Sequence, residues 1–344
     1  MNKQGLETTA RAMVAEGKGL LAMDESTPTC GKRLQAVGVE NTEANRITYR
    51  ELLLGTPGLG DYISGAILYD ETLRQKTHDG TPFPALAERQ GILPGIKVDT
   101  GAKDLAGHPN EKVTEGLDGL RERLAGYRDL GARFCKWRAV ITLGAGIPSR
   151  ACIEANAHAL ARYAALCQEA ALVPIVEPEV LIDGDHTIER SFEVTLETQR
   201  AVFEQLYRQG VLFEGMVLKP SMVIAGKKCA RQSSPEQVAE WTLRCLRATV
   251  PAAVPGIAFL SGGQGDEQAT QNLNAMNALG RELHLPWRLT FSYARALQHP
   301  ALVKWSGRPA NAEAARRIFL HRARCNAAAS RGRYTAALEQ ESAA

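Results

Sequence analysis

The sequence lacks the features that mark several large classes of protein. No apolar run approaches the ~18 residues that a membrane-spanning helix needs. The first residues, MNKQGLETTARAM, lack the apolar core of a signal peptide. The 41 Lys and Arg residues against 38 Asp and Glu residues give a formal charge of +3, which excludes an overall field that attracts nucleic acid. We therefore expect a cytoplasmic protein with neither a membrane nor a nucleic acid as partner.

Motifs for disulfides, metals and nucleotides are also absent. The 7 Cys residues are scattered and contain no CxxC pair, which favours reduced thiols. The 7 His residues form no HxH or HxxxH pair, whereas a catalytic metal needs about three protein ligands. Neither a GxGxxG nor a P-loop pattern occurs. We therefore expect no cofactor and no metal-dependent reaction.

Short apolar runs alternate with helical stretches along the whole chain. The eight runs lie at 17–24, 62–69, 94–99, 132–141, 172–181, 214–223, 255–263 and 287–295. No Gly-, Pro- or Ser-rich linker separates two halves, so the pattern predicts one α/β domain over 1–344. Eight such units favour a (β/α)₈ TIM barrel, which needs about 250 residues. A doubly wound open sheet is the alternative.

The remaining residues are expected to form additions to the barrel. We place the barrel at about 17–307 and a C-terminal helix and tail at 308–344, with the helix at 309–329. An N-terminal helix is expected at 6–16. Apolar residues at three- and four-residue steps from Val113 to Tyr127 predict a further helix.

Charged residues interrupt several of the runs. They are Asp24, Lys97, Asp99, Lys136, Arg138, Glu177, Glu179 and Lys219. Both faces of a barrel strand are buried, so a charge there is costly. Any one of these residues is more often part of a buried ion pair, but so many in one barrel indicate an active site at its C-terminal mouth.

Three of these charges are lysines, and they suggest a type of chemistry. A neighbouring like charge and partial desolvation both lower the pKa of a lysine and free an amine nucleophile. Such an amine attacks a carbonyl group and forms an iminium ion. The route needs a carboxyl group that moves protons, and Glu177 is a candidate. The alternative for Lys219 is a strand-end lysine that reaches solvent.

A glycine-rich segment, SGGQG at 261–265, follows the seventh run. Backbone N–H groups of such a segment bind anions, although most glycine-rich turns are only turns. Barrels often bind phosphate after strands seven and eight, and Arg295 ends the eighth run. Arg33 and Arg46 are candidates for a second anion, with solvated helix charges as the alternative.

Taken together, these motifs resemble the class I, Schiff-base fructose-1,6-bisphosphate aldolases. The resemblance is collinear from about residue 6 to 335. The segments that carry it are GLLAMDEST (19–27), KRLQAVGVENTEANR (32–46), GIKVDTG (95–101), KWR (136–138), VPIVEPEVL (173–181), LKPSMV (218–223), FLSGGQ (259–264) and SYARALQ (292–298). It implies a (β/α)₈ barrel and metal-independent, reversible cleavage of a sugar bisphosphate into dihydroxyacetone phosphate and glyceraldehyde 3-phosphate. It also implies a homo-oligomer, specifically a homotetramer.

The resemblance further implies roles for individual residues. Lys219 matches the Schiff-base lysine, a choice that the residues alone leave open. Glu177 matches the acid/base of carbinolamine dehydration, Asp24 the group that acts on the C4 hydroxyl, and Lys136 a positioning lysine. Glu179 is grouped with these catalytic residues. The expected substrate contacts are Ser261, Gly262, Gly263 and Arg295 for the C1 phosphate, and Lys97, Arg138, Arg33 and Arg46 for the other phosphate or the hydroxyls.

The sequence departs from the animal members of this family at its end. Those enzymes finish in a mobile tail with a terminal tyrosine that assists proton transfer, whereas this sequence ends in ESAA. We expect another group or water to protonate the enamine. Ser221 is a smaller departure, at a position where Asn is frequent.

Two other functions compete with this interpretation. A transaldolase-like Schiff-base enzyme would not use both anion sites. A non-catalytic sugar-phosphate-binding protein would form an iminium without cleaving its ligand.

Overall fold

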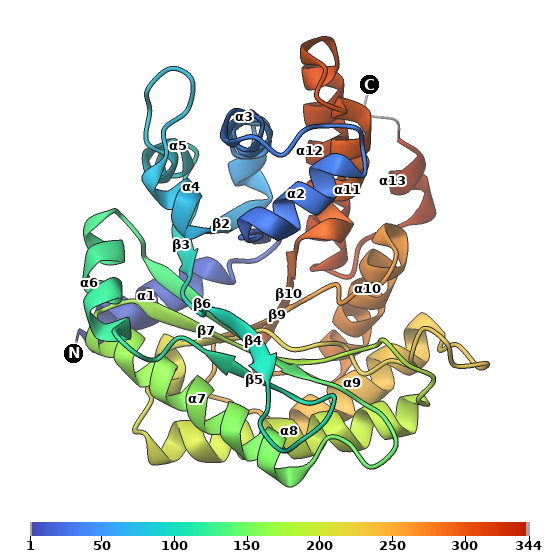
Figure 1. The fold of residues 1–344 in the computed structure, drawn as a ribbon. Helices are drawn as coiled ribbons and strands as arrows, with labels where there is room; N and C mark the ends of the chain where they lie inside the picture. The colour runs from blue at the N-terminus through green and yellow to red at the C-terminus, as the bar shows by residue number, and fades with distance from the viewer. Residues whose placement is uncertain (1, 342–344) are drawn as a thin grey trace.

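Eight parallel strands close into a barrel in the computed structural model, which describes residues 2–341 (Figure 1). Around the barrel the strands follow the order β1-β10-β9-β8-β7-β6-β3-β2. Their bounds are Gly19–Met23 (β1), Ile63–Leu68 (β2), Leu93–Lys97 (β3), Phe134–Ile141 (β6), Val173–Val180 (β7), Val217–Leu218 (β8), Gly256–Phe259 (β9) and Arg288–Tyr293 (β10). The closed barrel is confirmed, and the doubly wound open sheet is wrong. Residues 342–344, at the end of the expected tail, lie outside the described residues.

Helices connect the strands and surround the barrel (Figure 1). Their bounds are Lys3–Met13 (α1), Thr27–Gln35 (α2), Glu43–Leu54 (α3), Asp70–Arg74 (α4), Phe83–Arg89 (α5), Leu120–Asp129 (α6), Arg150–Glu169 (α7), Ile188–Arg208 (α8), Pro235–Thr249 (α9), Asp266–Glu282 (α10), Arg295–Trp305 (α11), Ala312–Ala329 (α12) and Ala336–Gln340 (α13). Local signals define some of these ends. The Ser234 hydroxyl caps α9, the Gln237 side chain completes the capping box, and Pro235 occupies the first turn. Within residues 2–341, no helix is both long and apolar enough to span a membrane.

Two predicted elements differ from the structure, and one pair of strands was not predicted. The run 214–223 forms only the two-residue strand β8, because Phe213–Gly215 is a 3₁₀ turn and the chain leaves the sheet soon after Leu218. The predicted helix from Val113 begins only at Leu120. Val113 instead belongs to an antiparallel hairpin, β4 (Gly101–Asp104) and β5 (Lys112–Glu115), which the sequence did not predict.

The helices flanking the barrel match the expected additions with shifted bounds. The N-terminal helix is α1, which begins three residues before the predicted start. The C-terminal helix is α12, which is preceded by a 3₁₀ turn at Pro309–Asn311. The apolar side chains of α1 and of the barrel interior form one core cluster. Its strand members include Leu20, Phe134, Ile175 and Val217. Helix α1 therefore closes one end of the barrel and leaves the other end for the site.

Candidate active site

The interior of the barrel changes from apolar to charged along several of the strands. Phe134 is followed two residues later by Lys136, Ile175 by Glu177, and Val217 by Lys219. Side chains two residues apart on a strand point to the same face, so these charges continue the inward-facing rows. Because the strands are parallel, all of the charges reach the same end of the barrel, at the carboxyl ends of the strands.

A cavity of about 730 Å³ opens at this end. The structure brings together there all of the predicted site residues except Arg46, namely Asp24, Arg33, Lys97, Lys136, Arg138, Glu177, Glu179, Lys219, Ser261, Gly262, Gly263 and Arg295. The cavity is large enough for a small phosphorylated metabolite and is lined by charged groups of both signs.

Four charged side chains form a connected chain at the bottom of the cavity. Glu177 lies between two lysines: its Oε1 is 3.2 Å from Lys219 Nζ and its Oε2 is 3.3 Å from Lys136 Nζ. Lys136 Nζ also lies 2.7 Å from Asp24 Oδ2. Lys136, Glu177 and Lys219 are each 3% exposed. Glu177 Oε2 accepts no hydrogen bond from any described residue despite its distance to Lys136, so one buried acceptor remains free.

The electrostatics of Lys136 differ from the prediction. Burial disfavours its charged form, but Asp24, Glu177 and Asp99 more than offset that cost and raise the pKa of Lys136 above its usual value. The lowered pKa expected from clustered lysines is therefore wrong for Lys136. Its ammonium instead serves as a fixed positive charge between two carboxylates.

Asp24 is the complementary negative charge. Burial opposes its ionisation, yet Lys136 and Lys219 lower the pKa of Asp24 from 3.8 to about 2. Asp24 is therefore an ionised carboxylate at neutral pH, able to accept a hydrogen bond or a proton from a bound hydroxyl group.

This shift makes a prediction for stability in acid. A carboxyl group whose pKa falls from 3.8 to about 2 on folding contributes about 2 kcal/mol, fully present above about pH 4. Protonation removes this contribution as the pH falls through 2, and about 1 kcal/mol of it is lost by about pH 3. We expect the free energy of unfolding in urea to fall more between pH 6 and pH 3 in the wild type than in Asp24→Asn. Equal losses in the two proteins would contradict the assignment.

A second layer of ion pairs surrounds the centre. Lys97 Nζ lies 2.7 Å from Asp99 Oδ1, and Asp99 Oδ2 accepts a hydrogen bond of 3.2 Å from the backbone N–H of Arg138. The Arg138 guanidinium pairs with Glu179. Lys97 and Arg138 thus present cationic groups to the cavity while their carboxylate partners hold them in place.

The glycine-rich segment after β9 forms one wall of the cavity. Gly262 and Gly263 have φ values of +55° and +89°, a backbone region that favours glycine. A Cβ on Gly263 would lie 2.5 Å from Lys227 Nζ and 3.4 Å from Arg295 Nη2. The bare backbone therefore leaves space between two cationic side chains, and α11 begins at Arg295. This arrangement suits a phosphate.

The two arginines proposed for the second anion lie in different places. Arg33 lines the cavity and pairs with Glu25. Arg46 lies outside the cavity lining: its Nε and Nη2 bond to Glu71 at 2.9 and 2.5 Å, and its Nη1 bonds to Asn41 at 2.8 Å. Because Arg46 does not line the cavity and its guanidinium is held by Glu71 and Asn41, we leave Arg46 out of the proposed substrate contacts.

Sequence reasoning missed three further charged residues of the cavity, Glu25, Asp183 and Lys227. Lys227, on the loop after β8, reaches the glycine-rich wall and pairs with Asp183 at 2.9 Å. Glu25, next to Asp24, is the partner of Arg33. Position on a loop that follows a barrel strand was a usable signal for all three residues, since loops at that end of the strands build the sites of such barrels.

Comparison with known proteins gives the same family throughout. Residues 5–344 match the family model described as "Glycolytic: Fructose-bisphosphate aldolase class-I". A "Probable fructose-bisphosphate aldolase class 1" from Xanthomonas campestris pv. campestris is 61% identical over 335 residues, covering 97% of this chain and 99% of that protein. A chloroplastic fructose-bisphosphate aldolase from Oryza sativa subsp. japonica is 52% identical over 330 residues, covering 96% of this chain and 84% of that protein.

A solved structure matches the fold over nearly the whole chain. It is the fructose-bisphosphate aldolase of Plasmodium falciparum, in a complex with TRAP and a small-molecule inhibitor. The TM-score is 0.95 and the sequence identity 49%, over 96% of this chain and 95% of that one. The family model, the similar sequences and the matching fold together show that the chain belongs to the class I fructose-bisphosphate aldolase family.

Proposed function

We propose that this chain catalyses the reversible aldol cleavage of fructose 1,6-bisphosphate into dihydroxyacetone phosphate and glyceraldehyde 3-phosphate, through a Schiff base on Lys219. The observation that carries the proposal is the position of Glu177, whose carboxylate oxygens lie 3.2 Å from Lys219 Nζ and 3.3 Å from Lys136 Nζ. A buried amine with a carboxylate in contact has the two groups that imine formation needs.

In the first stage Lys219 attacks the C2 carbonyl of the substrate. The Lys219 nitrogen forms a bond to C2, and the carbonyl oxygen becomes the hydroxyl of a carbinolamine. Glu177 is within reach to take a proton from the lysine nitrogen and to return one to that hydroxyl, which leaves as water. The product is an iminium ion, which accepts electrons at C2.

In the second stage the bond between C3 and C4 breaks. Asp24, ionised because the pKa of its carboxyl is about 2, accepts the proton of the C4 hydroxyl as the C4 carbonyl forms. The electron pair of the broken bond moves onto the iminium and gives an enamine. Lys136, held 2.7 Å from Asp24, keeps that carboxylate in position and stabilises it as an anion. Protonation of the enamine at C3 and hydrolysis then release the ketose product.

Two cationic regions hold the two phosphates. Ser261, Gly262, Gly263 and Arg295 are assigned to the C1 phosphate at one wall of the cavity. Lys97, Arg33 and Arg138 are assigned to the other phosphate or to the sugar hydroxyls. Binding both ends fixes the reacting carbons next to Lys219, so we expect a doubly phosphorylated ketose to react with a higher kcat/KM than a singly phosphorylated one.

Assays of cleavage with both kinds of ketose test the proposed function. Fructose 1,6-bisphosphate should be cleaved at the same rate with and without EDTA, and with a higher kcat/KM than fructose 1-phosphate. Equal kcat/KM values would favour a transaldolase-like use of one anion site. An iminium that forms without cleavage would favour a binding protein.

Replacing Lys227 with alanine should weaken substrate binding. Lys227 Nζ lies beside Gly263, so its loss removes one charge from the proposed C1-phosphate region. We expect KM for fructose 1,6-bisphosphate to rise about 10-fold with little change in kcat. Lys228→Ala is the matched control, because Lys228 is the next residue but is absent from the cavity lining. An unchanged KM in Lys227→Ala would remove Lys227 from the site.

We also infer that the chain folds as one domain over 1–344 and works in the cytoplasm as a homotetramer. The family resemblance supports the oligomeric state, and the barrel with its flanking helices supports a single unit. Tyr207 on α8 is 76% exposed and is a candidate for a subunit contact. Light scattering on the eluting protein measures the mass in solution, and a monomer mass of 37.3 kDa would overturn the tetramer.

A further inference from the structure

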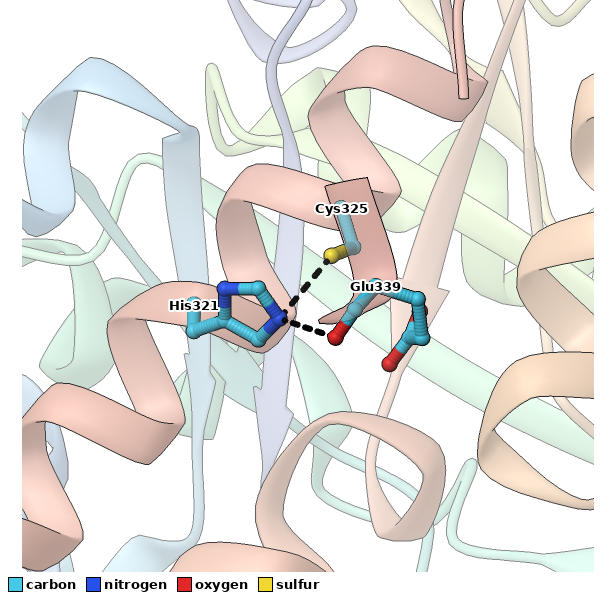
Figure 2. A group of neighbouring side chains, drawn as sticks. All are labelled: His321, Cys325 and Glu339. Carbon is cyan, nitrogen blue, oxygen red and sulfur yellow. Dashed lines mark hydrogen bonds between the residues drawn. The ribbon is translucent and has the colours of Figure 1, made fainter. Parts of the chain in front are cut away.

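A second group of chemically reactive side chains lies outside the barrel mouth, where the C-terminal helices meet (Figure 2). His321 and Cys325 are one turn apart on α12, and Glu339 belongs to α13. One ring nitrogen of the histidine, the thiol sulfur and a carboxylate oxygen all lie within 4.8 Å of one another. None of the three residues lines the mouth cavity, and the proposed aldol reaction uses none of them.

The spacing of these atoms suits a tetrahedral metal ion. Zinc binds histidine nitrogen at about 2.0–2.1 Å and thiolate sulfur at about 2.3 Å, which places the two ligand atoms about 3.6 Å apart at a tetrahedral angle. His321 Nε2 and Cys325 Sγ are 3.5 Å apart. Because the two residues are four positions apart, they lie on the same face of α12, one turn apart. Figure 2 shows the His321 ring nitrogen facing both the Cys325 sulfur and the main-chain carbonyl oxygen of Glu339.

The surroundings of Glu339 hold the third ligand in place. Its carboxylate pairs with the guanidinium of Arg322 and accepts a hydrogen bond of 2.7 Å from the Tyr334 hydroxyl. Carboxylates that bind metals are commonly oriented by such neighbours. The thiolate and the carboxylate together balance the charge of a divalent cation, and Arg322 adds one positive charge that limits the affinity.

We propose that His321, Cys325 and Glu339 bind a thiophilic divalent cation of the zinc type, which fastens α13 to α12. A nitrogen, a sulfur and an oxygen ligand suit Zn²⁺ and the similar ion Co²⁺, whereas Mg²⁺ and Ca²⁺ prefer oxygen ligands alone. On binding, the Cys325 thiol loses its proton to solvent and the sulfur forms a bond to the metal. His321 uses Nε2, which at present lies 3.3 Å from the Glu339 carbonyl oxygen. Water completes the four-coordinate site.

Metal titrations of the purified, chelator-treated full chain test this site. We expect the wild type to take up one Zn²⁺ per chain in competition with a chromophoric chelator. Co²⁺ should give an absorption band from thiolate-to-metal charge transfer. Cys325→Ser and His321→Ala should each raise the Kd for Zn²⁺ at least about 100-fold and remove the Co²⁺ band or shift it. Added Zn²⁺ should raise the thermal midpoint of the wild type and leave that of Cys325→Ser unchanged.

The matched control is Cys229→Ser, which removes a more accessible thiol that lies outside the cluster. This variant should bind Zn²⁺ as the wild type does. Loss of zinc binding in Cys229→Ser would overturn the proposal. So would zinc binding that is retained in both Cys325→Ser and His321→Ala, or a Co²⁺ spectrum without a thiolate band. If Cys325→Ser fails to fold, zinc binding by His321→Ala and Glu339→Gln tests the proposal in the same way. Because the readouts are metal uptake and stability, failure here is distinguishable from failure of the aldolase assignment.

Discussion

Lys219→Arg is expected to reduce cleavage of fructose 1,6-bisphosphate by at least about 10⁴-fold in kcat. An arginine keeps a positive charge near Glu177, so the pairing at the bottom of the cavity is largely preserved. Its guanidinium stays protonated in proteins and has no free electron pair for attack on C2. The loss therefore reports the missing nucleophile rather than a missing charge. Initial rates of product formation measure it.

Two accompanying measurements separate chemistry from folding. The thermal midpoint of Lys219→Arg should stay close to that of the wild type, because the buried ion pair with Glu177 is conserved. The variant should still bind the bisphosphate, since the residues assigned to the phosphates are unchanged. A folded Lys219→Arg protein with more than about 1% of the wild-type kcat would rule out Lys219 as the essential nucleophile.

Glu177→Gln is expected to lower kcat by about 10²–10⁴-fold. The amide has the same shape as the carboxylate but moves no protons, so the carbinolamine loses water slowly. The substitution also removes a negative charge from between Lys136 and Lys219, both of which are 3% exposed. Removing one partner of a buried pair costs about 3–5 kcal/mol, although Asp24 still neutralises Lys136. We therefore expect a lower free energy of unfolding together with the loss in kcat.

Glu179→Gln provides the comparison for this effect. Glu179 lies two residues further along β7 but pairs with Arg138 rather than with a lysine. Glu179→Gln should lower kcat less than Glu177→Gln does. In Glu179→Gln the Schiff base should still form at the wild-type rate. Equal losses in the two variants would mean that the carboxylates act through the general charge of the cavity and not through proton transfer at Lys219.

Much of the fold follows from local patterns in the sequence. Seven of the eight strands lie within the predicted runs, and β3 begins one residue before its run, at Leu93. Apolar, β-branched segments of that length are favoured only where both faces of a strand are buried. The site follows from the same patterns: charges such as Lys136 and Glu177, two residues beyond apolar interior positions, had to gather at one end of a parallel barrel.

What the sequence did not reveal depends on contacts between distant segments. The sequence predicts an anion-binding role for Arg46 because its partner Glu71, 25 positions away, is identified only by the folded structure. The raised pKa of Lys136 depends on Asp24, which follows the end of β1 across the barrel mouth. The hairpin formed by β4 and β5 has strands of four residues, too short for a clear alternating pattern.

The cluster at the C-terminal helices was missed for the same reason. A pattern of paired histidines does not include His321 with Cys325, and Glu339 joins them only when α13 packs against α12. Such a group of ligands has no fixed spacing along the chain, so it is recognised from coordinates and not from a motif.

The most direct test of the proposed mechanism is reduction with sodium borohydride in the presence of dihydroxyacetone phosphate, followed by mass mapping of the digested protein. The mechanism predicts one reduced adduct per chain, located on Lys219 and formed in parallel with loss of activity. An adduct on Lys136 or Lys97 instead of Lys219, or an active enzyme from which no adduct is trapped, would contradict it.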